Sequence, residues 1–244
     1  MNKRIEKEII VTFLKNRKSV TNGEIYNLFS KKEPGIKKST VNWRIHYLTD
    51  MGLISRIGRG IYGLGSEKKF KHGITAHQRR VSKEVAKQFP FIKYCVWDVS
   101  VLKEFVLHIF NINFLIIEAE RDASSSVFQY IKDSNNSTFL DPDERVMEEY
   151  VLTAKSPIIV KPLISEAPVN VQGEIKLPSL EKILVDIVSD KDMFYFIQGS
   201  EIINIYKSAS EKYTINFDRL YRYAKRRNSY DDIKSIFDQI NGNK

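Results

Sequence analysis

The sequence of 244 residues predicts a two-domain protein of the mixed α/β (α+β) class. Three observations predict it: helical spacing and a hairpin signal in the first third, alternating strand-like and helical runs in the middle, and helical spacing from Pro178 onward. The alternation favours a mixed or parallel sheet in the second domain, which has a helical C-terminal end. We expect a first domain at 1–66, a linker with a connecting helix at 67–90, and a second domain at 91–244.

The first domain is predicted to contain three helices. Apolar residues at helical spacing mark a first helix near the N-terminus, and Thr21 or Asn22 can cap a short second helix. Ser39 or Thr40 can cap the third helix. Gly52 is a natural left-handed terminator for that helix, because glycine tolerates positive φ.

Two short strand-like runs, 53–57 and 61–64, follow the third helix and flank Gly58-Arg59-Gly60, which is a hairpin signal. Three helices followed by a two-stranded wing is the order of a winged helix-turn-helix domain. The same glycines, with Gly63, match the spacing of a dinucleotide fingerprint. That motif needs a strand before the glycines and a helix after them, so we expect no cofactor here.

The third helix carries the residues that we expect to contact DNA. Val41, Ile45 and Leu48 form one apolar stripe that should face the core. The opposite side carries hydroxyl, amide and aromatic side chains flanked by lysines, which suits base edges and phosphates in a major groove. The predicted DNA-binding residues are Lys37, Lys38, Ser39, Thr40, Asn42, Trp43, His46 and Tyr47, with Arg56 and Arg59 at the hairpin.

The distribution of charge supports this interpretation. The net charge is +9, and residues 1–80 hold 18 Lys or Arg against 6 Asp or Glu, whereas the rest of the chain holds 21 against 24. The whole positive excess therefore lies in the N-terminal third, which indicates a module that binds a polyanion. An ordinary solvated helix, or a winged helix that binds only protein, is the alternative.

In the second domain we expect three strands within the apolar runs 92–99, 113–120 and 156–163, and helices within 100–110, 122–134 and 143–152. Asp98, Glu118 and Glu120 lie at the ends of two of these strands. A similar acidic arrangement followed by lysine holds the metal of two-metal nucleases, but Glu120 occupies the lysine position. We therefore expect a structural acidic pair and neither a metal site nor enzymatic activity; a metal-dependent nuclease is the alternative function.

Two helical runs complete the second domain. In "PSLEKILVDIV" the apolar residues should face inward and leave Glu181 and Lys182 outside. "DRLYRYAKRR" interleaves basic and aromatic residues, a combination that can grip nucleic acid or a phosphorylated surface. Its basic residues are Arg219, Arg222, Lys225, Arg226 and Arg227.

The sequence lacks an apolar run long enough to cross a membrane, and its single cysteine, Cys95, excludes an internal disulfide. The composition is typical of a cytoplasmic protein, because a chain with one cysteine fits a reducing compartment.

Several runs together resemble one family. The winged helix ending in "GLISRIGRGIYGL" is followed by "YCVWDVSVLKEF", "NFLIIEAERDASSSVFQYI", "IIVKPLISEAP", "LPSLEKILVDIV" and "YTINFDRLYRYAKRR". Together they resemble the AbiEi-like antitoxins, the transcriptional-regulator half of abortive-infection type IV toxin–antitoxin pairs, which act in phage defence. The resemblance covers nearly the whole chain.

The resemblance implies two roles. The winged helix would bind promoter repeats in double-stranded DNA and repress its own operon, and the resemblance adds Arg44 to the DNA-binding residues. The second domain would counter a nucleotidyltransferase-like toxin without requiring a stable complex with it. The resemblance places the antitoxin surface on the basic cluster at 219–227.

Overall fold

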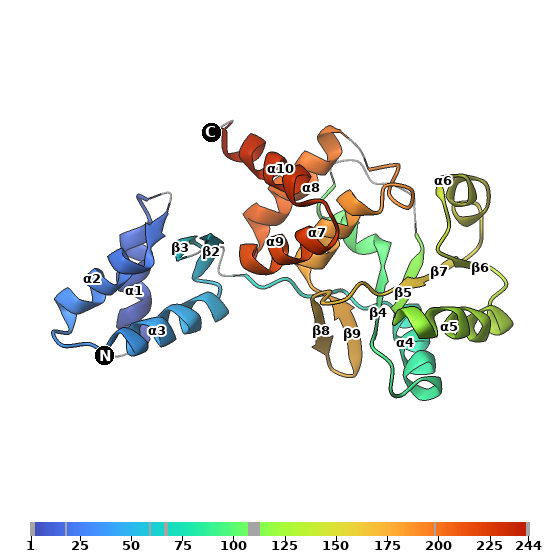
Figure 1. Ribbon diagram of the computed structural model, residues 1–244, viewed down its shortest axis with the longest axis horizontal. Helices are drawn as coiled ribbons and strands as arrows, with labels where there is room; N and C mark the ends of the chain where they lie inside the picture. Colours follow the sequence, from blue (N-terminus) through green and yellow to red (C-terminus); the bar gives the residue numbers. More distant parts are fainter. Residues whose placement is uncertain are drawn as a thin grey trace. The chain divides into compact units, whose positions relative to one another are not determined.

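The computed structural model describes residues 3–17, 19–58, 60–65, 68–106, 113–197 and 199–242, and the fold is mixed α/β (Figure 1). The chain forms two compact units. The first unit comprises residues 1–70 and 209–221, and the second comprises 71–208 and 222–244. The segment 209–221, which we expected in the second domain, therefore packs with the N-terminal residues.

The first unit contains three helices and a three-stranded antiparallel sheet of order β1-β3-β2. The helices lie where the sequence predicted them, and so does the hairpin of β2 and β3. The additional strand β1 contributes two residues to the edge of β3 and was not expected. The elements are α1 (Lys3–Leu14), β1 (Val20–Thr21), α2 (Asn22–Lys32), α3 (Lys38–Asp50), β2 (Ile54–Gly58) and β3 (Ile61–Leu64).

Two of the three helix-end predictions are confirmed. Thr21 caps α2: its Oγ1 accepts from the Glu24 N–H at 3.2 Å, and the Glu24 carboxylate accepts from the Thr21 N–H at 2.7 Å. Gly52 follows α3 with a φ of +73°. The predicted cap of α3 by Ser39 or Thr40 is wrong, because the helix begins at Lys38 and both residues lie in its first turn.

Apolar side chains from all three helices form the core of the first unit. Val41, Ile45 and Leu48 of α3 are buried in it as predicted, together with Ile25 and Phe29 of α2. The segment 209–221 is anchored to this unit by polar contacts as well. The Thr214 hydroxyl donates to the Gly52 carbonyl at 3.0 Å. The orientation of α3 is thus fixed by packing on its inner side.

A mixed four-stranded sheet is the centre of the second unit, with strand order β4-β5-β7-β6. β4 is antiparallel to β5, whereas β5, β7 and β6 are parallel. The sequence predicted β4, β5 and β7 but missed β6, which is only three residues long. The strands are β4 (Tyr94–Asp98), β5 (Leu115–Ala119), β6 (Thr138–Leu140) and β7 (Ile158–Pro162).

Helices cover both faces of this sheet (Figure 1). One face packs on α4 (Ala76–Gln88) and α5 (Arg121–Ser134) through alternate strand residues such as Val96 and Ile117. The opposite face carries Glu118 toward α7 (Leu180–Ser189). The helices after α7 are α8 (Ser200–Lys212), α9 (Phe217–Arg226) and α10 (Tyr230–Gly242).

The remaining elements are short. A hairpin of β8 (Val169–Gln172) and β9 (Ile175–Pro178) leads into α7 and was not predicted. In the range 100–110, where a helix was expected, the described residues form a 3₁₀ helix, η1 (Val99–Glu104), and 107–110 lie outside the described residues. The helix expected at 143–152 is α6 (Glu144–Val146) followed by the π-helical turn η2 (Met147–Val151). None of the helices in the described part of the chain combines the length and the apolar character that a membrane span requires.

Candidate functional site

The outer face of α3 presents most of the residues predicted to bind DNA. Lys37, Lys38, Ser39, Asn42, Trp43 and His46 are exposed, and Thr40 and Tyr47 are half-buried. Trp43 leaves 57% of its surface exposed and stacks on Tyr47, with ring centroids 5.6 Å apart and planes 6° from parallel. A large aromatic held in this way is a rigid contact surface, because stacking limits its rotamers.

Polar side chains on the same face have local partners that orient them. The Asn42 carbonyl oxygen accepts from Asn22 Nδ2 at 3.2 Å, which leaves the Asn42 amide nitrogen as a donor. His46 Nδ1 lies 3.2 Å from the Asp50 carboxylate, one turn along the helix. The face therefore offers an oriented amide and imidazole beside exposed hydroxyl and ammonium groups.

Two of the three predicted arginines, Arg44 and Arg56, differ from this pattern. Arg44 is only 6% exposed, and its Nη2 lies 2.8 Å from Glu33 Oε2. The resemblance implied that Arg44 contacts DNA, but Arg44 is buried, because it lies one turn from Val41 and Leu48 on the inner side. Arg56 forms an ion pair with Asp218. Arg59 lies outside the described residues.

In the second unit, the three acidic residues considered for a nuclease site do not converge. The strand register pairs Glu118 with Cys95 and Asp98 with Leu115, which places Glu118 and Asp98 on opposite faces of the sheet. Asp98 instead caps η1 by accepting from the Ser100 N–H at 2.8 Å. Within the residues that the structure describes, no group of three or more His, Cys, Asp or Glu is arranged to hold a metal ion.

Glu118 is the acceptor in a buried ion pair. Lys182 Nζ lies 2.5 and 2.7 Å from the two carboxylate oxygens, and Trp97 Nε1 donates to Oε1 at 3.1 Å. The sequence placed Lys182 on the solvent side of its helix, and that prediction was wrong, as was that for Glu181. Apolar residues lie on all sides of α7, and a helix with this pattern is buried all round.

Asp186 is the second partner of Lys182 and also accepts from the Tyr223 hydroxyl at 2.9 Å. Burial is the largest influence on this carboxyl and raises its pKa to about 6, although Lys182 acts in the opposite direction. Burial alone lowers the pKa of Lys182, but Asp186 and Glu118 outweigh it and raise that pKa well above its ordinary value. Lys182 is therefore a permanent cation shared by two carboxylates.

Asp190 joins two further cations to this network. Its Oδ1 lies 2.7 Å from Lys161 Nζ and 2.5 Å from Arg227 Nη2, while Arg227 Nε lies 3.8 Å from Asp186. Burial raises the pKa of Asp190, but the two cations outweigh it and hold the pKa below its usual value. The ionic network, defined as Glu118, Lys161, Lys182, Asp186, Asp190 and Arg227, thus balances three cations with three carboxylates.

One residue of the predicted antitoxin surface, Arg227, belongs to the ionic network instead. Arg227 has only 11% of its side chain exposed and is neutralised by Asp190, so its place in an exposed cluster was wrong. Arg222, Lys225 and Arg226 are exposed and lie in the second unit, whereas Arg219 is half-buried and lies in the first. The exposed basic surface is accordingly smaller than the sequence indicated.

Comparisons with known proteins give a family for this chain but no function for these sites. A model of a protein family described as "Family of unknown function (DUF6577)" matches residues 40–243. The match begins inside α3 and continues through the second unit to α10. A search of curated proteins gave no match.

Proposed function

The chain belongs to DUF6577, a family of unknown function, and from its own residues we propose that it is a transcriptional repressor that binds double-stranded DNA. The observation that carries the proposal is the outer face of α3, where Lys38, Asn42 and Trp43 are exposed on a helix whose inner face is fixed in a core. A helix held in this way can enter a major groove without rearrangement.

We read the first unit as a winged helix-turn-helix domain. Its helices, α1 to α3, precede a β2–β3 hairpin in an antiparallel sheet, as such a domain requires. In such a domain α3 contacts base edges in the major groove and the hairpin contacts the DNA backbone. Lys37 and Lys38, at the N-terminus of α3, would contact phosphates, since a helix N-terminus and two ammonium groups attract the same charge.

The resemblance to AbiEi-like antitoxins supports a wider proposal. The protein would repress its own operon in the cytoplasm and counter a nucleotidyltransferase-like toxin. We assign the second role to the exposed Arg222, Lys225 and Arg226, without Arg227. A nuclease role is not supported, because Asp98 and Glu118 lie on opposite faces of the sheet.

Protein binding by the first unit is a second candidate function. It is favoured by apolar side chains that are exposed at the end of α3 and on the hairpin, namely Met51, Ile57, Ile61 and Leu64. Such side chains are common at protein interfaces, whereas a DNA-binding wing needs polar or basic groups. Binding to DNA decides between the two functions.

The test is a fluorescence-anisotropy titration of labelled duplex DNA from the region upstream of the gene, using the full chain. Trp43→Ala should weaken binding roughly tenfold, because it removes the largest exposed contact on α3. Tyr150→Ala is a matched control, since Tyr150 in the second unit is also an aromatic that is 57% exposed. Equal affinities of the two variants, or no binding by the parent protein, would contradict the proposal and favour the protein-binding function.

A further inference from the structure

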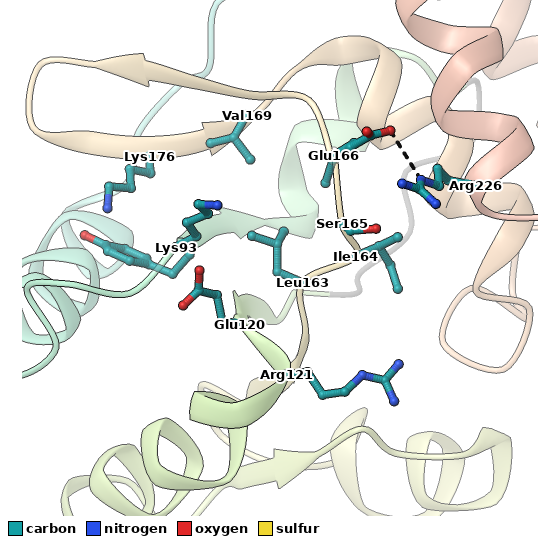
Figure 2. A pocket seen from close by; sticks show the side chains of 12 residues that line it. Lys93, Glu120, Arg121, Leu163, Ile164, Ser165, Glu166, Val169, Lys176 and Arg226 are labelled. Atoms are coloured by element: carbon teal, nitrogen blue, oxygen red, sulfur yellow. Dashed lines mark hydrogen bonds and ion pairs between the residues drawn. The ribbon is translucent and has the colours of Figure 1, made fainter.

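A pocket of about 880 Å³ opens in the second unit at the carboxyl ends of the parallel strands β5 and β7 (Figure 2). Ligands of open α/β sheets bind outside this edge, and the volume lies in the range of small-molecule sites. The walls come from the start of β4, the start of α5, the loop 163–168, β9 and the end of α9. No sequence motif marks this pocket, since its residues come from five separate segments.

The charged groups of the pocket favour an anion. Four cations line it, Lys93, Arg121, Lys176 and Arg226, against the two carboxylates Glu120 and Glu166. Arg226 Nε lies 3.2 Å from Glu166 Oε2, and Lys176 Nζ lies 4.4 Å from the centre of the Tyr94 ring.

Two of these cations are not neutralised by the protein. Within the described part of the chain, the side chains of Lys93 and Arg121 form no ion pair or hydrogen bond. The four cations and two carboxylates together give the pocket a net charge of +2. The side chains of Lys93 and Arg121 are available to a ligand.

The first turn of α5 adds donors beside Arg121. Glu120 is the residue before the helix, and its side chain forms no capping hydrogen bond. The first N–H groups of a 14-residue helix are then available to a bound anion, which the helix dipole also favours. Arg121 lies at this end of the pocket, whereas Lys93 lies on the other side of Glu120 and points away from Arg121 (Figure 2).

The loop between β7 and β8 shapes the opposite wall. Glu166 has a φ of +61°, a left-handed conformation that costs a non-glycine residue about 1 kcal/mol and persists only where neighbouring contacts hold it. The Leu163 N–H donates to the Ala119 carbonyl at 2.6 Å, and the Ala167 N–H donates to the Ile164 carbonyl at 3.1 Å. These bonds fix the loop against β5, so the pocket is preformed.

Apolar side chains lie between the charged ends. In Figure 2, Leu163 and Val169 separate Lys93 and Lys176 from Arg226. A bare inorganic ion would leave this apolar surface uncovered. An organic ligand that carries both an anionic group and a carbon skeleton covers it.

We propose that this pocket binds a small organic phosphate, either a nucleotide or a sugar phosphate. The phosphate lies against Arg121 and the first turn of α5, where charge-assisted hydrogen bonds hold it, and Lys93 adds a second unpaired positive charge to the pocket. Glu120 accepts from a ligand hydroxyl, as acidic residues do with ribose. Leu163 and Val169 pack on the carbon skeleton. This inference is independent of DNA binding, because every residue involved belongs to the second unit.

The experiment is isothermal titration calorimetry of the full chain with ADP, ribose 5-phosphate and inorganic phosphate at equal ionic strength. We expect ADP or ribose 5-phosphate to bind with a dissociation constant below about 1 mM and inorganic phosphate to bind more weakly. Preference for ADP identifies a nucleotide site, and preference for ribose 5-phosphate identifies a sugar-phosphate site.

The double variant Lys93→Ala/Arg121→Ala should weaken binding of the preferred probe by about tenfold or more. Lys132→Ala/Lys155→Ala removes two exposed lysines of the second unit away from the pocket and should bind as the parent does. A melting temperature close to that of the parent shows that each variant is folded. The proposal is overturned if neither organic probe binds at about 5 mM. It is equally overturned if inorganic phosphate binds as tightly, or if the two double variants bind alike.

Discussion

Lys182 of α7 and Glu118 of β5 form a buried ion pair, with Nζ 2.5 Å from one carboxylate oxygen and 2.7 Å from the other. The Lys182 side chain is fully buried and also pairs with Asp186 one turn along the helix. One cation therefore pairs with two carboxylates between the sheet and α7.

Lys182→Met should lower the free energy of unfolding by about 3–5 kcal/mol, because it leaves two buried carboxylates without their cation. Glu118→Gln should cost less, since Lys182 keeps Asp186 and the new amide oxygen can still accept from Trp97. Urea unfolding followed by circular dichroism measures both values. Lys83→Met, on the exposed side of α4, is the control and should stay within about 0.5 kcal/mol of the parent. A Lys182 variant as stable as that control would show that the ion pair does not stabilise the fold.

The raised pKa of Asp186 predicts how stability changes with pH. Its folded-state pKa, about 6, lies above the ordinary value of 3.8, so the folded state binds this proton more tightly than the unfolded state. Protonation of Asp186 therefore adds to the free energy of unfolding. This contribution is complete below about pH 4, is lost as the pH rises through about 6, and amounts to at most about 3 kcal/mol.

The measurement is the unfolding free energy of the parent minus that of Asp186→Asn, between about pH 7 and pH 4. The subtraction is needed because His72 also makes stability depend on pH. Burial lowers the pKa of His72, so its contribution to the free energy of unfolding decreases as the pH falls, over a neighbouring pH range. The difference should grow in favour of the parent as the pH falls. A difference that is constant with pH, or that shrinks, would contradict the raised pKa.

Adjacent arginines at the end of α9 provide a matched pair. Arg227→Ala should destabilise the protein by about 3–5 kcal/mol, because it strips a buried cation from Asp190 and Asp186. Arg226→Ala should cost less than about 1 kcal/mol, since its pair with Glu166 is half exposed. Thermal or urea unfolding ranks the two variants, and the opposite order would refute the network as described.

A side chain at position 65, in place of Gly65, is expected to clash within the first unit. A Cβ at this position would lie 2.0 Å from the Gly52 carbonyl oxygen, because the Gly65 N–H donates to the Leu53 carbonyl at 2.8 Å. Gly65→Ala should therefore destabilise the protein by more than about 1 kcal/mol. Gly73→Ala, where a Cβ meets nothing within 4 Å, should be neutral or slightly stabilising. Equal unfolding midpoints for the two variants would show that the β3 end is free to move.

Local patterns were sufficient to predict most helices and the strands β4, β5 and β7. The helices combine helical spacing with capping residues, and the strands are compact apolar runs. These patterns missed β6 and the β8–β9 hairpin, which are too short to show a period. They also missed that 209–221 packs with the N-terminal residues, because no local signal reports a contact between distant segments.

The candidate sites show the same limit. The exposure of Trp43 and Asn42 followed from the stripe of Val41, Ile45 and Leu48. The burial of Arg44 could also have been found, because it lies three residues after Val41 and four before Leu48 on the inner side. The pairing of Lys182 with Glu118 joins residues 64 positions apart. Only the fold brings them together.

The central claim is that α3 binds duplex DNA, and the salt dependence of binding by the full chain tests it most directly. The logarithm of the binding constant for promoter DNA should fall linearly with the logarithm of salt concentration. Lys37→Ala/Lys38→Ala should reduce that slope by about 1.8, roughly 0.9 for each lost phosphate contact, whereas the control Lys132→Ala/Lys155→Ala should keep the parent slope. No binding at low salt, or the same slope in all three proteins, would contradict the account.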